Sequence, residues 1–186
     1  NSGWSRQALV EQGASAEKIH VLPLGYEPPT RKGMVRSPQK NGDALTVLWL
    51  GTVTIRKGIQ YLVEAARRLR STSIQFLLAG SISIRSEAVE AAPGNMEWLR
   101  RVPRTQVREL LDRADIHVLP TLSDGFGMSQ LEAMAHGVPV VATPNCGRVV
   151  EDGKTGCFIE PRSAEALAEV LLRLEKNRAM LQEMAA

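Results

Sequence analysis

Short apolar segments alternate with amphipathic ones along most of this chain. The apolar segments are four to six residues long and rich in Val, Ile and Leu, which is typical of buried strands. The expected strands are Lys18–Leu22, Leu45–Leu50, Ile74–Ala79, Met96–Leu99, Ile116–Leu119, Val138–Ala142 and Gly156–Ile159.

The segments between these strands carry helical patterns. In Gly58–Arg70, apolar residues recur at helical spacing and fall on one face. Thr105 and Ser163 stand where they cap the starts of two further helices. The other expected helices are Ile84–Ala92, Gln106–Arg113, Met128–His136, 163–174 and the tail to Ala186. Strands that alternate with helices predict an α/β fold with a parallel sheet covered on both faces.

Composition narrows the function only a little. The chain has 186 residues, of which 44% are hydrophobic, enough for one domain with a sizeable core. A net charge of +3 is too small to indicate a nucleic-acid partner, and no apolar run approaches the roughly 20 residues of a membrane span. Cys146 and Cys157 are too few and isolated for a disulfide framework or zinc site, which favours two reduced thiols.

The stretch Ser123–Pro144, SDGFGMSQLEAMAHGVPVVATP, carries the strongest chemical signal. Asp124 and Glu132 stand eight residues apart, and the loop GFGM between them runs straight into a helical segment. A helix N-terminus presents unpaired N–H groups and suits phosphate, whereas carboxylates accept hydrogen bonds from sugar hydroxyls. The combination indicates a ligand that is both phosphate and sugar.

This stretch resembles the acidic motif of retaining glycosyltransferases with the GT-B fold, most closely family 4, the glycosyl transferases group 1. The family pattern is Glu, seven residues, Glu, and this chain keeps the spacing with Asp124 at the first position. In the family the first acid contacts the donor sugar and the second holds the ribose hydroxyls, which assigns these roles to Asp124 and Glu132. Aspartate is one methylene shorter than glutamate, so the sugar contact at Asp124 is expected to be weaker, water-bridged or altered in specificity.

The resemblance covers almost the whole chain and implies the C-terminal, donor-binding half of a GT-B fold, with a Rossmann-like sheet. It implies that residues 1–24 are a lead-in segment from a missing N-terminal domain. Residues 25–43, rich in Pro, Gly and charge, are expected to be a linker or long loop, and residues 44–186 the nucleotide-sugar-binding domain.

The loop Gly51–Gly58, GTVTIRKG, follows an expected strand directly and carries two adjacent cations. In the resembling family a Lys before a Gly binds the donor diphosphate at this place, which transfers that role to Lys57. The family often has Arg where Thr52 stands, and Arg56 is the alternative source of a second charge. The other interpretation is that Arg56 and Lys57 are solvated residues at a helix start, where a cation costs ~0.3–1 kcal/mol.

Further ligand contacts are expected around these loops. The N–H groups of the GFGM turn suit diphosphate and sugar oxygens, although Phe126 alternatively belongs to the core. Gly80 ends a strand at the edge where such sheets bind ligands, and Val102 either lines the base pocket or packs ordinarily. Together with two positions of the loop after the expected strand Leu45–Leu50, Gly51 and Thr52, the candidate ligand contacts are Gly80, Val102, Gly125, Phe126, Gly127 and Met128. His20, His117 and His136 lack metal-ligand spacing and are interpreted as packing or surface residues.

The resemblance implies transfer of a sugar from a nucleoside diphosphate sugar to an acceptor hydroxyl, with retention. Lys57 and the helix N-terminus would replace a metal ion, so no cofactor is expected. The identity of the acceptor (sugar, lipid or small molecule) is left open. The protein is expected in the cytoplasm, and whether the missing domain associates with the inner face of the membrane is also left open. The isolated chain is expected to be inactive. The alternatives are a non-catalytic nucleotide-binding module, which the departures at Thr52 and Asp124 favour, and a related epimerase or sugar phosphorylase.

Overall fold

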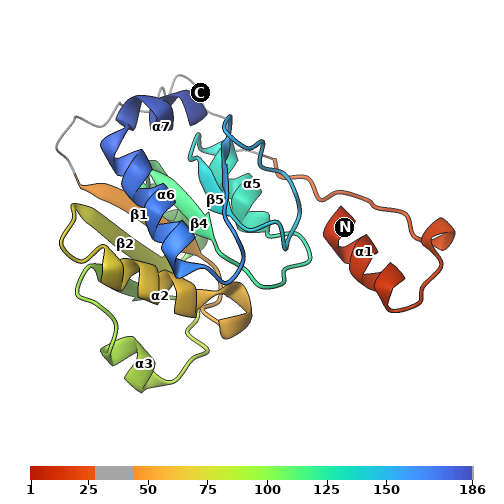
Figure 1. The fold of residues 1–186 in the computed structure, drawn as a ribbon, viewed down its shortest axis with the longest axis horizontal. Helices are drawn as coiled ribbons and strands as arrows, with labels where there is room; N and C mark the ends of the chain where they lie inside the picture. The colour runs from red at the N-terminus through yellow and green to blue at the C-terminus, as the bar shows by residue number, and fades with distance from the viewer. Residues whose placement is uncertain (28–43, 186) are drawn as a thin grey trace.

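The computed structural model describes residues 1–27 and 44–185, and its centre is a six-stranded sheet (Figure 1). All neighbouring strands pair in parallel, in the order β3-β2-β1-β4-β5-β6. The strands are β1 (Leu45–Leu50), β2 (Ile74–Ala79), β3 (Met96–Arg100), β4 (Ile116–Leu119), β5 (Val140–Ala142) and β6 (Gly156–Phe158). The α/β prediction is confirmed.

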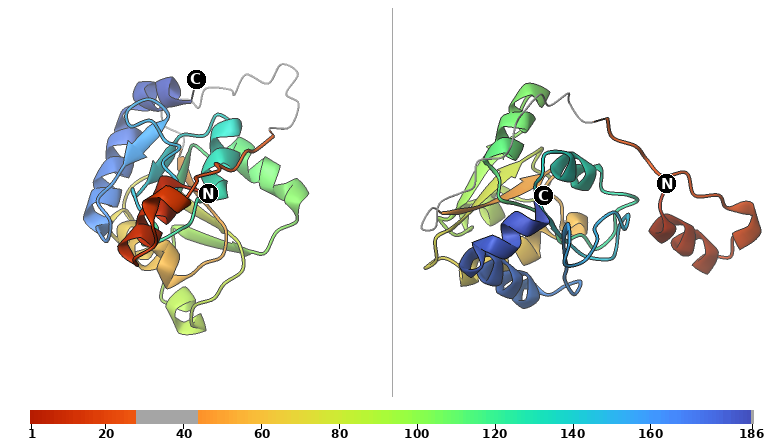
Figure 2. Two further views of the ribbon diagram at one scale, coloured as in Figure 1. Left: turned by 90° about the vertical axis from the view of Figure 1, so that its right-hand side faces the viewer. Right: turned by 90° about the horizontal axis from the view of Figure 1, so that it is seen from above.

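Helices cover both faces of the sheet (Figures 1 and 2). On one face lie α2 (Ile59–Arg68), α6 (Ala164–Lys176) and α7 (Arg178–Met184), and on the other lie α4 (Arg104–Arg113) and α5 (Met128–Ala135). Strand β1 serves both cores, because alternate side chains of a strand point to opposite faces. Leu45, Val47 and Trp49 pack under α2 and α6, whereas Leu48 and Leu50 pack under α4 and α5.

The N-terminal residues differ from the prediction. Helix α1 (Gly3–Glu11), capped by Ser2, and the short 3-10 helix η1 (Ala16–Lys18) were not anticipated, and residues 19–27 form no strand. The expected strand Lys18–Leu22 is therefore wrong. A strand is stable only with a neighbour to pair with, and this segment runs outside the sheet with Leu22 77% exposed. Most of the expected linker 25–43 lies outside the described residues.

Several element boundaries also need correction. Thr105 lies inside the first turn of α4, and Pro103 is the residue before that helix, so Thr105 is not its cap. Strand β5 begins two residues later than expected, because Pro139 has no N–H for the ladder. The Ser163 cap is confirmed, since its Oγ accepts the Ala166 N–H at 3.0 Å. The short α3 (Ser86–Glu90) lies within its expected range.

The strand order reverses direction next to β1. The chain runs outward from β1 through β2 to β3 and then returns to β4 on the other side of β1. In open parallel sheets the crevice beyond the carboxyl ends of strands at such a switch point is where ligands bind. The loops after β1 and β4 both end there, so the fold brings together the two loops that the sequence singled out.

Candidate functional site

A cavity of about 570 Å³ opens at the carboxyl ends of β1 and β2, beside the start of α5. All but one of the predicted site residues line it, although they come from four separate parts of the sequence. These are Gly51, Thr52, Lys57, Gly80, Val102, Asp124, Gly125, Phe126, Gly127, Met128 and Glu132. The exception is Arg56.

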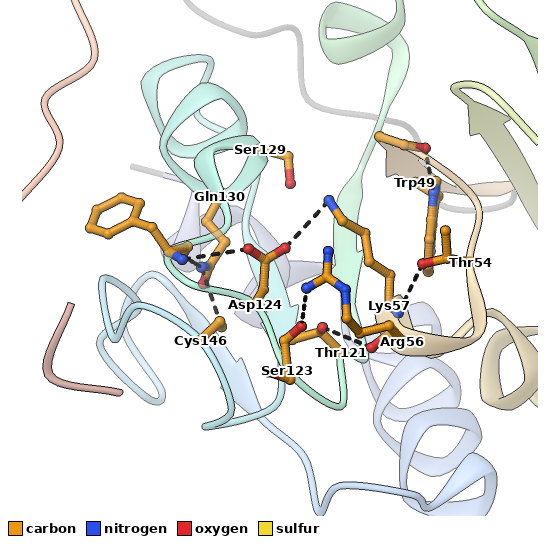
Figure 3. A network of polar contacts seen from close by, with 12 residues as sticks. Trp49, Thr54, Arg56, Lys57, Thr121, Ser123, Asp124, Ser129, Gln130 and Cys146 are labelled. Carbon is orange, nitrogen blue, oxygen red and sulfur yellow. Dashed lines mark hydrogen bonds and ion pairs between the residues drawn. The ribbon is translucent and has the colours of Figure 1, made fainter. Parts of the chain in front are cut away.

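Lys57 and Asp124 both line this cavity, and their side chains point toward each other (Figure 3). The Lys57 Nζ lies 3.3 Å from Asp124 Oδ2, and the two side chains are only 20% and 16% exposed. This Oδ2 atom is buried and has an ion-pair partner, yet it accepts no hydrogen bond within the described residues. The other oxygen, Oδ1, accepts the Phe126 N–H at 3.5 Å. The pair therefore places a cation and a carboxylate at the wall of the cavity, and Asp124 Oδ2 keeps unused hydrogen-bonding capacity.

The loop after β1 holds Lys57 in place through its own short turn. The 3-10 helix η2 (Ile55–Lys57) starts at Thr54, whose Oγ1 accepts the Lys57 N–H at 3.3 Å. It ends at Gly58, where the backbone is left-handed with a φ of 85°. The Trp49 Nε1 donates to the Gly51 carbonyl at 3.0 Å and ties down the beginning of the same loop. Lys57 thus projects from a backbone that is fixed at both ends.

Arg56 points to a different place from its neighbour. Its side chain is exposed, and its guanidinium donates to the carbonyl of Ser123. The Arg56 carbonyl accepts from the Thr121 hydroxyl at 3.2 Å and from the Leu122 N–H at 2.9 Å. Arg56 therefore fastens the Lys57 loop to the Asp124 loop. Thr52, where the resembling family often has Arg, lines the cavity and is exposed.

Helix α5 turns its N-terminus and one side toward the cavity. Gly127 is the residue before the helix, and no side chain caps it in the described structure, so first-turn N–H groups are left for a ligand. Glu132, one turn further along, is half-buried and has no hydrogen-bond or ion-pair partner among the described residues. The Phe126 side chain is only 5% exposed, as expected for a core residue, and Phe126 also lines the cavity, so its contact with a ligand stays a prediction.

Two buried polar residues behind the site were missed by the sequence interpretation. The Gln130 Nε2 donates to the Phe126 carbonyl at 2.9 Å and to the Gly147 carbonyl at 3.1 Å, which fixes the GFG turn. His117, assigned to packing, bonds Ser129 of α5 through Nε2 at 3.0 Å. The sequence feature that could have identified both is a polar residue inside an apolar segment, because such a residue needs a hydrogen-bond partner when it is buried.

The imidazole of His117 is fully buried and neutral at physiological pH. The pKa of His117 is lowered to about 4, chiefly by burial and to a smaller extent by the positive charge of Lys57, while the hydrogen bond with the Leu48 carbonyl opposes the shift. The carbonyl oxygen lies 3.0 Å from Nδ1. His117 therefore connects β1, β4 and α5 beneath the cavity without carrying a charge.

This lowered pKa predicts a pH-dependent stability. Between pH 6.5 and about 4 the unfolded chain protonates His117 while the folded chain does not, so stability falls as the pH falls through this range. The full effect is about 3 kcal/mol at 1.36 kcal/mol for each pH unit. Urea unfolding at pH 7, 5.5 and 4 measures it. Between pH 7 and 5.5 the free energy of unfolding should change less with pH in His117→Phe than in the wild type. An unchanged dependence would contradict the lowered pKa of His117.

The two buried cysteines do not form a second reactive centre. Burial raises the pKa of Cys146 to about 12 and also raises the pKa of Cys157, so neither buried thiol is an effective nucleophile at neutral pH. Within residues 1–27 and 44–185, no group of three or more His, Cys, Asp or Glu is placed to hold a metal ion. Over the same ranges, no helix has the length and apolar character to cross a membrane.

Known proteins are similar to this chain in sequence. The family model described as glycosyl transferases group 1 matches residues 44–177. The amylovoran biosynthesis glycosyltransferase AmsK of Erwinia amylovora is 30% identical over 186 residues, covering 92% of this chain and 45% of that protein. A D-inositol 3-phosphate glycosyltransferase of Arthrobacter sp. is 33% identical over 151 residues, covering 74% of this chain and 36% of that protein. This chain thus spans about half the length, or less, of these relatives.

Solved structures match over the whole length of this chain as well. HepE from Anabaena, in complex with UDP and glucose, has a TM-score of 0.82 and 21% identity and covers 100% of this chain and 55% of HepE. At that identity the likeness shows a shared fold. It agrees with the six-stranded parallel sheet and with helices on both faces.

Proposed function

Because the chain belongs to the glycosyl transferases group 1 family, we propose that it is the donor-binding half of a retaining, family 4-type glycosyltransferase. The whole enzyme moves a sugar from a nucleoside diphosphate sugar to an acceptor hydroxyl. One observation carries the proposal: Lys57, the uncapped start of α5 and two carboxylates face a single cavity. This set contains a cation and N–H donors for diphosphate together with acceptors for sugar hydroxyls.

In this proposal Lys57 and the α5 N-terminus stabilise the leaving diphosphate. Negative charge grows on the diphosphate as the bond to the sugar breaks, and a fixed cation and fixed N–H donors lower the energy of that state. They take the place of a metal ion. The diphosphate then competes with Asp124 for Lys57, from which Asp124 Oδ2 now lies 3.3 Å away.

The two carboxylates bind the two sugars of the donor. Asp124 accepts from hydroxyls of the transferred sugar through Oδ2, which is buried and lacks a hydrogen bond in the described structure. Glu132, which has no partner among the described residues, holds the ribose. The HepE complex with UDP and glucose makes UDP and UDP-glucose the first probes. The acceptor is bound by the rest of a longer protein acting in the cytoplasm, so the isolated chain does not catalyse transfer.

Nucleotide binding is the direct test. We expect one of UDP, GDP or ADP to stabilise the chain by about 2.7 kcal/mol at 100 times its Kd, measured by thermal shift and calorimetry. Glu132→Ala should weaken that binding about 10-fold or more, because a charged hydrogen bond is lost. Glu169→Ala, an exposed glutamate in the middle of α6, is the matched control and should bind as the wild type does. A folded chain that binds none of the three nucleotides would overturn the proposal.

A non-catalytic nucleotide-binding module remains the second candidate, favoured by Thr52 and Asp124. Thr52 supplies no charge, and Asp124 is already paired with Lys57. The double variant Thr52→Arg, Asp124→Glu in the full-length protein separates the two. Turnover of the donor before or after this change supports the enzyme, whereas nucleotide binding without turnover in either form supports the module.

A further inference from the structure

His117 and Ser129 form a hydrogen-bonded pair that links the buried core to the cavity. His117 is fully buried in β4, and Ser129 is half-buried in the first turn of α5 and lines the cavity. The Ser129 Oγ lies 3.0 Å from His117 Nε2, and the Leu48 carbonyl oxygen lies 3.0 Å from His117 Nδ1. Both ring nitrogens therefore have one partner each.

These partners determine where the protons lie. The Leu48 carbonyl can only accept, so His117 Nδ1 must carry the ring proton. The ring is neutral above pH 5, because burial and the charge of Lys57 hold the pKa of His117 at about 4. Nε2 is therefore bare and accepts the Ser129 hydroxyl proton. The oxygen of Ser129 has only lone pairs left for a ligand in the cavity.

We propose that His117 fixes the Ser129 hydroxyl as a hydrogen-bond acceptor, so that this side chain binds a hydroxyl of the donor substrate. The inference rests on the proposed function and deepens it. A serine without such a partner can turn its proton toward a phosphate oxygen, whereas Ser129 cannot do so without breaking the bond to His117. His117 acts through Ser129 and is a positioning residue.

The cavity is divided in consequence. Ser129 and Glu132 are three residues apart on α5, which places them on one side of the helix, and their side chains offer only acceptors. Lys57 and the start of α5 offer a cation and N–H donors. A nucleoside diphosphate sugar is thus bound in one orientation, with phosphate at Lys57 and a hydroxyl at Ser129.

The binding test compares Ser129→Ala with Ser129→Thr. Calorimetry uses whichever of UDP, GDP or ADP binds the wild type, its 2′-deoxy and 3′-deoxy forms, and the matching nucleotide-glucose. We expect Ser129→Ala to lose about 5-fold in affinity, the effect of one hydrogen bond. Ser129→Thr, which keeps the hydroxyl, should restore it. If the hydroxyl that binds Ser129 belongs to the ribose, Ser129→Ala should not reduce the affinity for the deoxy nucleotide that lacks this hydroxyl. If it belongs to the transferred sugar, Ser129→Ala should reduce the affinity only for the nucleotide-glucose.

Nitrogen NMR of the His117 ring tests the pair without any ligand. We expect a protonated Nδ1 and a bare, hydrogen-bonded Nε2 in the wild type, with only the Nε2 resonance moving in Ser129→Ala. A protonated Nε2 in the wild type overturns the inference. So does an unchanged affinity of Ser129→Ala for both the nucleotide and the nucleotide-glucose. Failure of the wild type to bind any of the three nucleotides instead overturns the proposed function on which the inference rests.

Discussion

Replacing Lys57 with alanine is expected to weaken nucleoside diphosphate binding by about 10- to 100-fold, which is the 1.5–3 kcal/mol typical of a hydrogen bond to a charged group. Two effects act in the same direction. The diphosphate loses the ammonium that lines the cavity, and the carboxylate of Asp124 loses the counterion that now lies 3.3 Å away. An unpaired carboxylate that is only 16% exposed then repels an anionic ligand.

Three comparisons isolate this effect in calorimetric titrations. Lys57→Arg keeps the charge and should retain more affinity than Lys57→Ala. Lys154→Ala removes the same charge from an exposed turn, where Lys154 is 78% exposed and paired with Glu151, and should bind as the wild type does. Binding of the nucleoside without phosphates should be unaffected by Lys57→Ala. Equal losses for nucleoside and nucleoside diphosphate would mean that Lys57 shapes the cavity and does not bind the phosphates.

The sheet was predictable from local sequence patterns, and most residues of the candidate site were identified from such patterns together with the family resemblance. Segments such as Leu45–Leu50 and Ile74–Ala79 are apolar over a strand's length and form strands with the expected bounds. Lys57 and Asp124 were identified separately from loops about 70 residues apart, and the structure brings them within 3.3 Å. This follows from parallel topology, because the loops after neighbouring strands β1 and β4 emerge at the same edge.

The features that could not be predicted depend on contacts with residues that are distant in the sequence. Residues 18–22 have the composition of a strand, but no neighbouring strand pairs with them, and Leu22 stays exposed. Arg56 and Lys57 are adjacent in sequence, yet only Lys57 lines the cavity, because the turn η2 sends the other side chain to the Ser123 carbonyl. The role of His117 depends on its two hydrogen-bond partners, and nothing in the spacing of its neighbours reveals them.

Gly58→Ala is expected to cost more than about 3 kcal/mol of stability, because it combines backbone strain with a collision. Gly58 has a φ of 85°, and a Cβ atom there would lie 1.8 Å from the Pro120 carbonyl oxygen and 2.7 Å from its carbon. Both are backbone atoms of the segment after β4, so neither can rotate away. The melting temperature should fall by about 10 °C, at 2–4 °C for each kcal/mol in a chain of this size.

Gly153→Ala separates the collision from the strain. Gly153 has a similar φ of 78°, but nothing lies within 4 Å of a Cβ atom there, so only the left-handed conformation should cost, about 1–2 kcal/mol. Urea unfolding gives the free energy of unfolding of both variants, and the difference between their losses is the cost of the collision with Pro120. Equal losses would show that this collision adds nothing to the backbone strain. Because Gly58 follows Lys57 directly and Pro120 leads into the Asp124 loop, we also expect folded Gly58→Ala to bind nucleotide more weakly, whereas Gly153→Ala should not.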